Sequence, residues 1–383
     1  MSCGWQSAWS VRQTGLMAKR GRTGALVALA LGAAAVWVGK DIPRQMGAKA
    51  KGDRLARVLA SPQFSGGKFR NTVPATELTG ASIPGLALAA MRDRESRHPR
   101  LPIPLVTPDP GLDADGLHVT WYGHSSALVE IEGRRVLLDP VWSERCSPSR
   151  ISGPKRLHEP PVALRDLPPL DAVLISHDHY DHLDMETIQN LVDLQAAPFL
   201  VPLGVGAHLE RWGVPTTRII ELDWNERAKV AGLEFIATAA RHFSGRGFSR
   251  DETLWTSWVI LGPTRRVFYS GDTGYFPGFA EIGQEHGPFD VTLVQVGAYG
   301  DAWPDIHMIP EDGVATHLDV RGGLMIPVHW ATFNLSLHEW PEPADRVWAE
   351  AKARDVRLAV PRPGERVDVD NPPAVDGWWQ AIA

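Results

Sequence analysis

The sequence predicts an α/β fold in which two β-sheets pack face to face with helices on their outer sides, a four-layer αββα sandwich. Short β-rich runs come first as hairpins, and later apolar runs alternate with helical segments. Residues 291–296 and 324–328 are continuous apolar runs, which are typical of strands covered on both faces. The chain has 383 residues, 44% of them hydrophobic, which is enough for one large domain or two ordinary ones.

Turn and capping residues mark the element boundaries after residue 117. The pair Glu132-Gly133 predicts a hairpin turn, Asp184 resembles a helix N-cap, and Pro310 suits the first turn of a helix. Helices are predicted at 185–194, 310–318 and 345–353. Strands are predicted at 118–121, 127–131, 135–138, 171–175, 233–238, 256–261, 266–269, 291–296 and 324–328.

The amino-terminal segment 1–51 differs in charge from the rest of the chain. It carries eight lysines and arginines against Asp41 alone, whereas the remainder has a net charge of −13. Residues 25–39 form an uncharged run of 15 residues, shorter than the ~20 of a spanning helix. The run suits the apolar core of a signal sequence or a short uncleaved anchor, and a buried helix is the alternative. We therefore expect a membrane-associated or exported protein of a bacterial-type envelope.

Three parts are predicted along the chain. The basic segment 1–51 contains the signal or anchor run, and residues 52–110 form an extension that packs on the main domain without a core of its own. Residues 111–383 are predicted to form the main domain, which carries the candidate functional residues described below. The sequence carries no indication of oligomeric state.

Composition excludes several classes of protein. The net charge of −6 lacks the basic excess of a nucleic-acid binder. Only two cysteines occur, Cys3 and Cys146, which argues against a disulfide framework and against a cysteine-based zinc finger. Histidine is the informative residue type, with 14 in the chain.

The stretch from Asp171 to His182 points to a metal site. An apolar strand runs directly into His177, His179, Asp181 and His182, four potential ligands within six residues. At a strand end, a spacing of two places His177 and His179 on one face. Imidazole and carboxylate groups together suit Zn²⁺ or another borderline metal ion.

Further candidate ligands follow later strands in the same way. His242, Asp272 and His329 each come shortly after a predicted strand. Each alone has a common structural explanation, as a hydrogen-bonded histidine or a turn aspartate. Together, downstream of the H-x-H-x-D-H motif, they support one metal site.

Runs flanking the metal motif carry a resemblance to a known family. The chain resembles the metallo-β-lactamase-fold hydrolases, and most closely the N-acylphosphatidylethanolamine phospholipase D family, from about His118 to Glu365. The metal motif marks the superfamily, and the flanking runs narrow it to this family. These runs are Trp121-Tyr122-Gly123-His124-Ser125-Ser126, Leu138-Asp139-Pro140, Gly153-Pro154-Lys155-Arg156, 167–184, Glu221-Leu222-Asp223-Trp224, Trp255-Thr256-Ser257-Trp258, Ser270-Gly271-Asp272-Thr273-Gly274-Tyr275, Val296-Gly297-Ala298-Tyr299 and His329-Trp330-Ala331-Thr332-Phe333.

The resemblance implies two zinc ions, although iron or manganese would suit the same ligands. One ion would be held by His177, His179 and His242. The other would be held by Asp181, His182 and His329, with Asp272 bridging both and acting in catalysis.

The resemblance also implies roles outside the ligand set. Asp139 is expected to orient a ligand histidine, and a strand-end turn residue is the equal alternative. His124 is expected near the metals, either in support of them or as a purely structural residue. His307 would contact substrate or assist the leaving group. Met308, Phe333 and Trp340 are candidates for lining an acyl-chain groove, with ordinary core packing as the alternative.

The implied activity is a phospholipase D-type phosphodiesterase acting on N-acylphosphatidylethanolamine-like lipids through a hydroxide shared by the two ions. The predicted partners are a phospholipid or other lipid substrate and a membrane, with no nucleic acid. A lactonase or other ester hydrolase of the same fold is the alternative enzyme. A non-catalytic membrane-associated protein is the alternative from another class, and it would have no need of all seven ligands.

Overall fold

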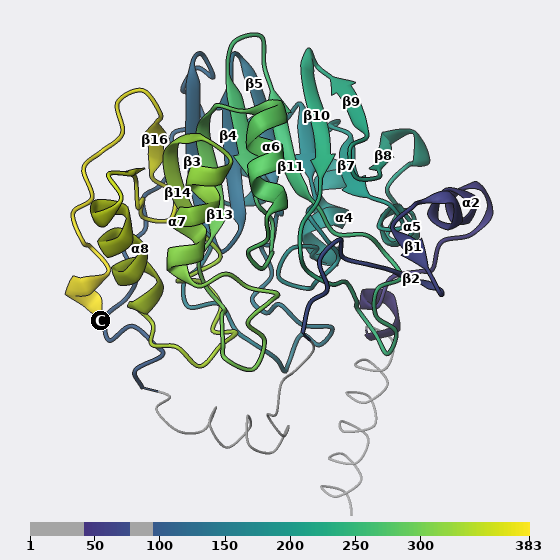
Figure 1. The fold of residues 1–383 in the computed structure, drawn as a ribbon, viewed down its shortest axis with the longest axis horizontal. Coiled ribbons are helices and arrows are strands. Elements are labelled where there is room, and N and C mark those ends of the chain that lie inside the picture. The colour runs from purple at the N-terminus through teal and green to yellow at the C-terminus, as the bar shows by residue number, and fades with distance from the viewer. Residues whose placement is uncertain (1–41, 77–94) are drawn as a thin grey trace, which may run out of the picture. The chain divides into compact units, whose positions relative to one another are not determined.

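Two seven-stranded sheets form the centre of the protein (Figure 1). The computed structural model describes residues 42–76 and 95–383, so the predicted signal or anchor run 25–39 lies outside the described residues. Residues from Met46 onward belong to one compact unit. None of the helices in the described ranges combines the length and hydropathy of a membrane span.

The first sheet starts with antiparallel hairpins and continues with parallel strands. Its order is β16 (Arg366–Asp368), β3 (Leu117–Gly123), β4 (Ser126–Ile131), β5 (Arg134–Leu138), β6 (Ala172–Leu174), β7 (Phe199–Pro202) and β8 (Ile219–Leu222).

The second sheet follows the same plan, with antiparallel pairs first and parallel pairs after β12. Its order is β15 (Arg357–Leu358), β14 (Gly322–Val328), β13 (Phe289–Gln295), β12 (Arg266–Tyr269), β11 (Ser257–Leu261), β10 (Leu233–Thr238) and β9 (Arg227–Val230).

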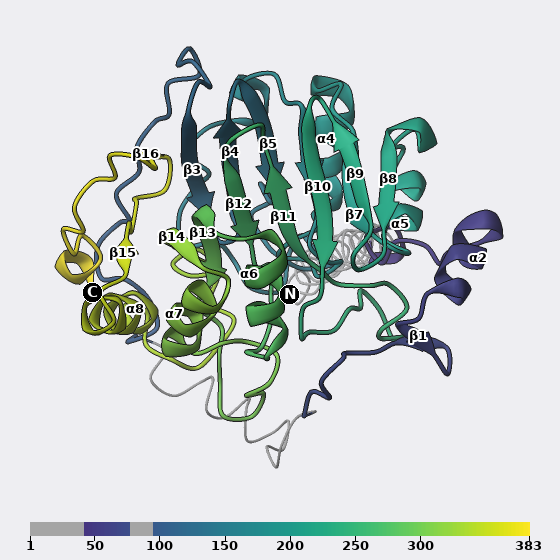
Figure 2. The ribbon, with the colours of Figure 1, turned by 45° about the horizontal axis from the view of Figure 1, so that its top comes forward.

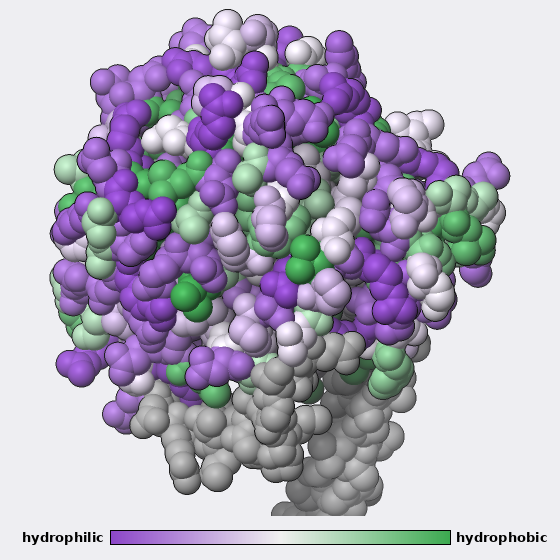
Figure 3. Space-filling view, viewed as in Figure 1, coloured by the Kyte–Doolittle hydropathy of each residue, from purple (hydrophilic) through white to green (hydrophobic). Residues whose placement is uncertain are grey.

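Helices cover the outer faces of both sheets (Figure 2). On the first sheet they are α4 (Met185–Leu194) and α5 (Gly206–Arg211), and on the second α6 (Gly278–His286), α7 (Pro310–Asp319) and α8 (Glu342–Ala353). Single 3-10 turns occur at Leu164–Asp166, Thr216–Arg218 and Gln380–Ile382. The predicted four-layer α/β class is therefore confirmed. The face that carries α6, α7 and α8 is mostly hydrophilic, with scattered apolar residues (Figure 3).

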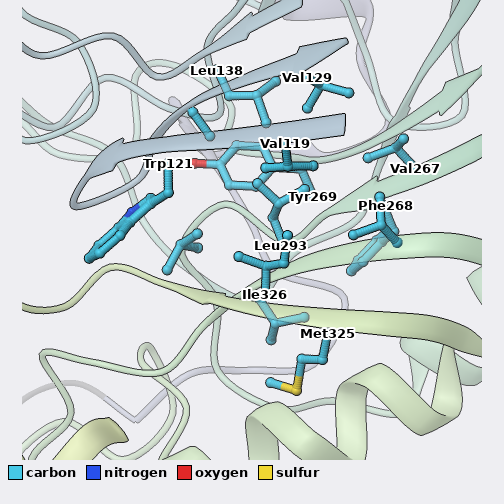
Figure 4. Packing of buried hydrophobic residues seen from close by; sticks show 14 of the residues in the cluster. Val119, Trp121, Val129, Leu138, Val267, Phe268, Tyr269, Leu293, Met325 and Ile326 are labelled. Carbon is cyan, nitrogen blue, oxygen red and sulfur yellow. The ribbon is translucent and has the colours of Figure 1, made fainter. Parts of the chain in front are cut away.

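Side-chain alternation along the strands builds the layers. In β3, Val119 and Trp121 point into the core between the sheets (Figure 4). Tyr122 belongs instead to the outer cluster that contains Ile188 and Leu191 of α4. In β4, Val129 joins the central core and Leu128 the outer one. Because a strand has a side-chain period of two, each of these strands contributes to two layers at once.

The predicted boundaries agree closely for the strongest elements. The helix α4 and the strands β10 and β12 have the predicted bounds, and Asp184 caps α4 by accepting from the amide of Glu186. The last helix begins at Glu342, three residues before the predicted start, because Pro343 fits its first turn. The strands β7, β8, β9, β15 and β16 and the helices α5 and α6 were not predicted.

The extension packs on the edge of the main domain. It contains α2 (Gly52–Ala60) and a short hairpin of β1 (Phe64–Ser65) and β2 (Lys68–Phe69). Val58 and Phe69 are buried in a cluster with Trp224, Leu254 and Trp255. The chain then runs through residues 70–76 toward the candidate site described below.

Candidate metal centre

The ends of four strands supply the side chains of the candidate site. The loop after β6 carries His177 to His182, while His242, Asp272 and His329 follow β10, β12 and β14. Gly271 precedes Asp272 with φ of 56°, and a Cβ there would lie 2.7 Å from Ser176 Cβ. Only glycine allows this close approach of the two strand ends.

The first half of the site contains three histidines, His177, His179 and His242. Their ligand atoms all lie within 4.8 Å of one another. Nδ1 of His179 lies 2.9 Å from Nε2 of His177 and 3.3 Å from Nε2 of His242. This is the set of residues that the family resemblance implies for one metal ion.

The second half contains Asp181, His182, His329 and also His124, again with ligand atoms within 4.8 Å. Oδ2 of Asp181 lies 2.9 Å from Nε2 of His124 and 3.2 Å from Nε2 of His329. His124 therefore contacts the predicted ligand Asp181 directly. Both His124 and His329 have positive φ, of 51° and 67°, a strained backbone that occurs often at functional sites.

Asp272 lies between the two halves. Its Oδ2 is 3.1 Å from Nε2 of His182 and 3.0 Å from Nε2 of His329. The same oxygen is 4.0 Å from Nε2 of both His177 and His242. The structure thus brings together all seven predicted ligands, with Asp272 in the position of a shared carboxylate. Their role as ligands stays a prediction.

Unsatisfied polar atoms fit the binding of cations here. Oδ1 of Asp272 is buried and has no hydrogen-bond partner among the residues that the structure describes, and Nε2 of His182 forms no well-aligned hydrogen bond although it lies 3.1 Å from Oδ2 of Asp272. Buried polar groups are normally paired, so orphaned atoms aimed into one cluster need an explanation. Bound metal ions would satisfy them, and imidazole with carboxylate is a donor set of Zn²⁺ and related ions.

Protonation states agree with the same chemistry. Burial and neighbouring imidazoles hold the pKa of His177 and His242 well below the ordinary value. Burial also lowers the pKa of His124 to about 3 and that of His307 to about 4. These imidazoles are therefore neutral at pH 7. A neutral imidazole has a free nitrogen lone pair, which can bind a metal ion or accept a hydrogen bond.

The carboxyl groups are ionised. Burial alone would raise the pKa of Asp181 and Asp272, but the adjacent His182 holds both well below the usual range. Burial would likewise lower the pKa of His329, yet the Asp272 carboxylate raises it to about 9. A divalent cation bound here would take over the charge compensation that protonated histidines provide.

Asp139 supports the site from behind. Its Oδ2 lies 2.7 Å from Nδ1 of His182, and its Oδ1 accepts from the amide of Ser176 at 2.7 Å. The hydroxyl of Tyr269 also donates to Asp139. The structure therefore places Asp139 where the sequence expects it, in contact with a ligand histidine. Tyr269 was not predicted, because a tyrosine inside a buried strand resembles an ordinary core residue.

An open cavity of about 770 Å³ lies over the candidate metal centre. Its floor, as we use the term, consists of His179, Asp181, His242, Asp272 and His307. Its wall consists of residues 69–71 and 74–76 of the extension, residues of the loop 243–251, Trp255, Ala298, Trp303, Ile306 and Leu335. The site is thus reachable by a ligand, and the extension forms part of its entrance.

Asn71 links the wall to the floor. Its side-chain amide donates to the carbonyl of His242 at 2.8 Å, and the amide of His242 donates back to Asn71 Oδ1 at 3.0 Å. Nε1 of Trp255 donates to the same oxygen at 2.9 Å. The sequence offers no signal for this contact, since Asn71 and His242 are 171 positions apart.

The predicted acyl-chain residues require correction. Met308 is fully buried in the core beside α7, and Trp340 packs in the core against Trp330 and Trp378. Phe333 is buried against His124 and the guanidinium of Arg156. None of the three lines the cavity. Proximity in sequence to His307 and His329 was misleading, because these side chains are buried among other residues and do not line the cavity.

His307 is placed as expected. It lines the cavity, and its Nε2 lies 3.8 Å from Oδ2 of Asp272. Its Nδ1 has no hydrogen-bond partner among the described residues. The apolar surface of the wall comes from other residues, Phe69, Phe243, Trp303, Ile306 and Leu335.

Comparison with known proteins agrees with this geometry. The family model described as "Beta-lactamase superfamily domain" matches residues 134–330. A Mycobacterium tuberculosis protein described as uncharacterised is 50% identical over 357 residues, which cover 91% of this chain and 96% of the relative. The N-acyl-phosphatidylethanolamine-hydrolyzing phospholipase D 1 of Caenorhabditis elegans is 34% identical over 276 residues, 69% of this chain and 78% of that protein.

Solved structures show the same fold. Igni18, a metallo hydrolase of the archaeon Ignicoccus hospitalis, aligns with a TM-score of 0.50 at 24% identity, over 66% of this chain and 97% of that one. An isothiocyanate hydrolase from Delia radicum gut bacteria aligns with a TM-score of 0.52 at 20% identity, over 67% and 100%.

Fold and site together define a metal-dependent hydrolase with a metallo-β-lactamase fold and a candidate centre of histidine and aspartate ligands. The chain belongs to the beta-lactamase superfamily. Within that superfamily it resembles the N-acylphosphatidylethanolamine-hydrolysing phospholipases D.

Proposed function

We propose that the protein is a phosphodiesterase of phospholipase D type that hydrolyses N-acylphosphatidylethanolamine-like lipids. The observation that carries the proposal is the position of Asp272 between two histidine-rich half-sites at the floor of an open cavity. The 34% identity to the C. elegans phospholipase over 276 residues supports the choice of substrate.

The residues of the floor suit a phosphodiester. Two zinc ions bound by the seven ligands would lower the pKa of water and withdraw charge from a phosphoryl oxygen. Asp139 fixes the orientation of His182, and Asn71 fixes the backbone of His242. His307 faces the cavity with a neutral imidazole, which can donate or accept a hydrogen bond to substrate.

The wall suits a lipid. The rings of Phe69, Phe243 and Trp303, with Ile306 and Leu335, offer apolar contacts above the floor. A lipid phosphodiester has one polar group and long apolar chains, so its phosphate would enter toward the floor while a chain contacts the wall. Water-soluble diesters lack these contacts and should react poorly.

We also propose that the protein associates with a membrane through its first 51 residues. One support is the uncharged run 25–39 within a basic segment. The other is a Klebsiella pneumoniae protein described as an outer membrane protein, which is 43% identical to this chain over an aligned stretch of 90 residues. Fractionation of cells that express the full chain, or a version starting at Gly52, tests this. Equal recovery of both in the cytosolic fraction would contradict the proposal.

A substrate panel tests the activity. Purified protein of measured metal content receives N-acylphosphatidylethanolamine, phosphatidylcholine, a simple phosphodiester and a lactone at matched concentrations. We expect phosphatidic acid and the N-acylethanolamine as products, with oxygen-18 from labelled water in the phosphate and no covalent protein adduct. A lactone hydrolysed far faster than any phospholipid would instead support the lactonase alternative. If none of these substrates is turned over, the result would support the alternative of a non-catalytic membrane-associated protein.

A further inference from the structure

Two arginines line the cavity without an acidic partner. Arg70 and Arg250 both contribute to the wall, and neither guanidinium forms an ion pair or hydrogen bond with any described residue. By contrast, Arg241 beside the cavity is paired with Asp305 at 2.9 Å, and the lining residue Asp251 is paired with Lys68 at 3.5 Å. The wall therefore carries two uncompensated positive charges.

Arg250 is held near the floor by an aromatic ring. Its guanidinium carbon lies 4.1 Å from the ring centroid of Phe243. The centroid of Phe243 is in turn 4.4 Å from that of His179 and 4.8 Å from that of His242. Stacking on Phe243 restricts the arginine to a position one ring away from the first half-site, and cation–π contacts favour such stacking.

The loop that carries Arg250 is attached to the metal motif itself. Oδ1 of the buried Asp178, within the H-x-H-x-D-H motif, accepts from the amide of Gly245 at 2.7 Å. Oδ2 of Asp178 accepts from the hydroxyl of Thr253 at 2.9 Å. Both ends of the 245–253 segment are therefore fixed to Asp178, the neighbour of His177 and His179, which limits the entropy lost when Arg250 binds a ligand.

The extension brings Arg70 to the same loop. The amide of Phe69 donates to the carbonyl of Asp251 at 2.8 Å. Arg70 follows Phe69 in the sequence, and Arg250 precedes Asp251. The two arginines therefore come from neighbouring backbone segments of the wall, and both line the same cavity. Two cations beside an apolar surface favour a ligand that combines a negative charge with apolar chains.

We propose that Arg70 and Arg250 form an anion subsite that selects phosphodiesters with a net negative charge, a conclusion that rests on the proposed function. A headgroup that carries its own cation, such as choline, would place like charges together at this wall, and this repulsion disfavours it. An N-acylated headgroup carries no such cation. The subsite would therefore favour N-acylphosphatidylethanolamine over phosphatidylcholine, although both lipids carry the same phosphodiester.

Calorimetric binding of di-n-butyl phosphate, a monoanion with apolar chains, tests the subsite without turnover of a lipid. The neutral tri-n-butyl phosphate is its uncharged counterpart. The full-length protein is compared with Arg250→Ala, Arg250→Lys, Phe243→Leu and the Arg70→Ala/Arg250→Ala double variant, and Arg165→Ala is the control at an exposed arginine outside the cavity. Metal content and thermal unfolding are measured for each variant.

We expect Arg250→Ala to weaken binding of the anion about tenfold, which is typical of a hydrogen bond to a charged group, and the double variant to weaken it further. Phe243→Leu should give a smaller loss in the same direction, and Arg250→Lys should retain part of the affinity. Raising the salt concentration should weaken wild-type binding more than that of the double variant. The arginine variants should lose several-fold less affinity for the neutral tri-n-butyl phosphate than for the dibutyl anion.

Vesicles separate lipid from soluble ligands. Phosphatidylcholine vesicles with and without N-acylphosphatidylethanolamine are compared as substrates, and the arginine variants should raise KM for the anionic lipid more than they lower kcat. Wild-type affinity for the dibutyl anion in the double variant, or no binding of this anion by the wild type, would overturn the subsite. Hydrolysis of N-acylphosphatidylethanolamine that is unaffected by the variants would leave the proposed function standing and the subsite refuted. Arginine-dependent anion binding without phosphodiester hydrolysis would support the subsite and refute the proposed function.

Discussion

The floor and the wall of the cavity are built in opposite ways. The floor residues His242 and Asp272 are only 1% and 3% exposed, and they are held at strand ends by hydrogen bonds and close backbone packing. The wall residues Arg70 and Arg250 are exposed and come from an extension and a loop. The difference suggests that the floor determines the chemistry, whereas the wall determines which molecule reaches it.

The largest effect should come from the residue shared by both halves of the floor. Asp272→Ala removes the carboxylate between the half-sites, so we expect loss of bound metal and a fall in kcat/KM of about 10³-fold or more. Elemental analysis and steady-state kinetics measure both. Asp193→Ala, at an exposed position on α4, is the matched control. Normal metal content and turnover in Asp272→Ala would show that the ligand assignment is wrong.

A smaller effect is expected one layer below the floor. Asp139→Asn should lower metal affinity or activity about 10- to 100-fold, because the amide no longer supplies a negative charge to Nδ1 of His182. Tyr269→Phe removes only one donor to Asp139 and should cost less. Competition with a chelator measures the affinity of each variant. If Tyr269→Phe proved the more damaging, Asp139 would not be the supporting group.

Asn71→Ala tests whether the wall also stabilises the floor. Loss of its two hydrogen bonds to the backbone of His242 should weaken metal binding about tenfold. Asn190→Ala on α4 removes a comparable side-chain amide bond far from the cavity and serves as the control. Equal metal affinity in both variants would mean that the extension contributes to the wall alone.

A buried histidine outside both regions should change stability without changing metal content. Burial lowers the pKa of His317 to about 4, and the ring is only 1% exposed beside Thr292. In the unfolded chain this histidine becomes protonated below about pH 6.5, whereas in the folded chain it stays neutral down to about pH 4. The free energy of unfolding therefore falls as the pH drops from ~6.5 to ~4, by up to about 3 kcal/mol.

Denaturant titrations at pH 7 and pH 4 give the free energy of unfolding of the wild type and of His317→Asn. The contribution of His317 is the difference between the two proteins in how much of this free energy is lost at pH 4. The variant should lose less stability on acidification than the wild type does. An identical pH dependence in both proteins would contradict the assignment, and altered metal content would show that this region is coupled to the floor.

The floor could be predicted from the sequence because local patterns encode it. An apolar strand followed by His177 and His179 indicates ligands on one face, and the family resemblance connects them with Asp272 and His329. The same local reasoning predicts both bounds of α4 and its N-cap at Asp184 as the structure has them. Short strands such as β9, with four residues of mixed polarity, carry too little periodicity to be predicted.

The wall could not be predicted, because it depends on contacts between distant segments. Nothing in the sequence around Asn71 indicates that it meets His242, and Arg250 resembles any loop arginine until Phe243 is seen beneath it. Met308 and Trp340 show the converse error, since apolar residues near ligands in sequence can point into the core. Side-chain direction in irregular loops is fixed by tertiary packing rather than by local pattern.

Anomalous diffraction from crystals of the protein, recorded at the zinc absorption edge and at those of iron and manganese, tests the central claim most directly. The account predicts two metal ions at the floor, one bound by His177, His179 and His242 and the other by Asp181, His182 and His329, with Asp272 contacting both. A protein prepared without chelators that shows no ion at these residues, or ions bound elsewhere, would contradict it.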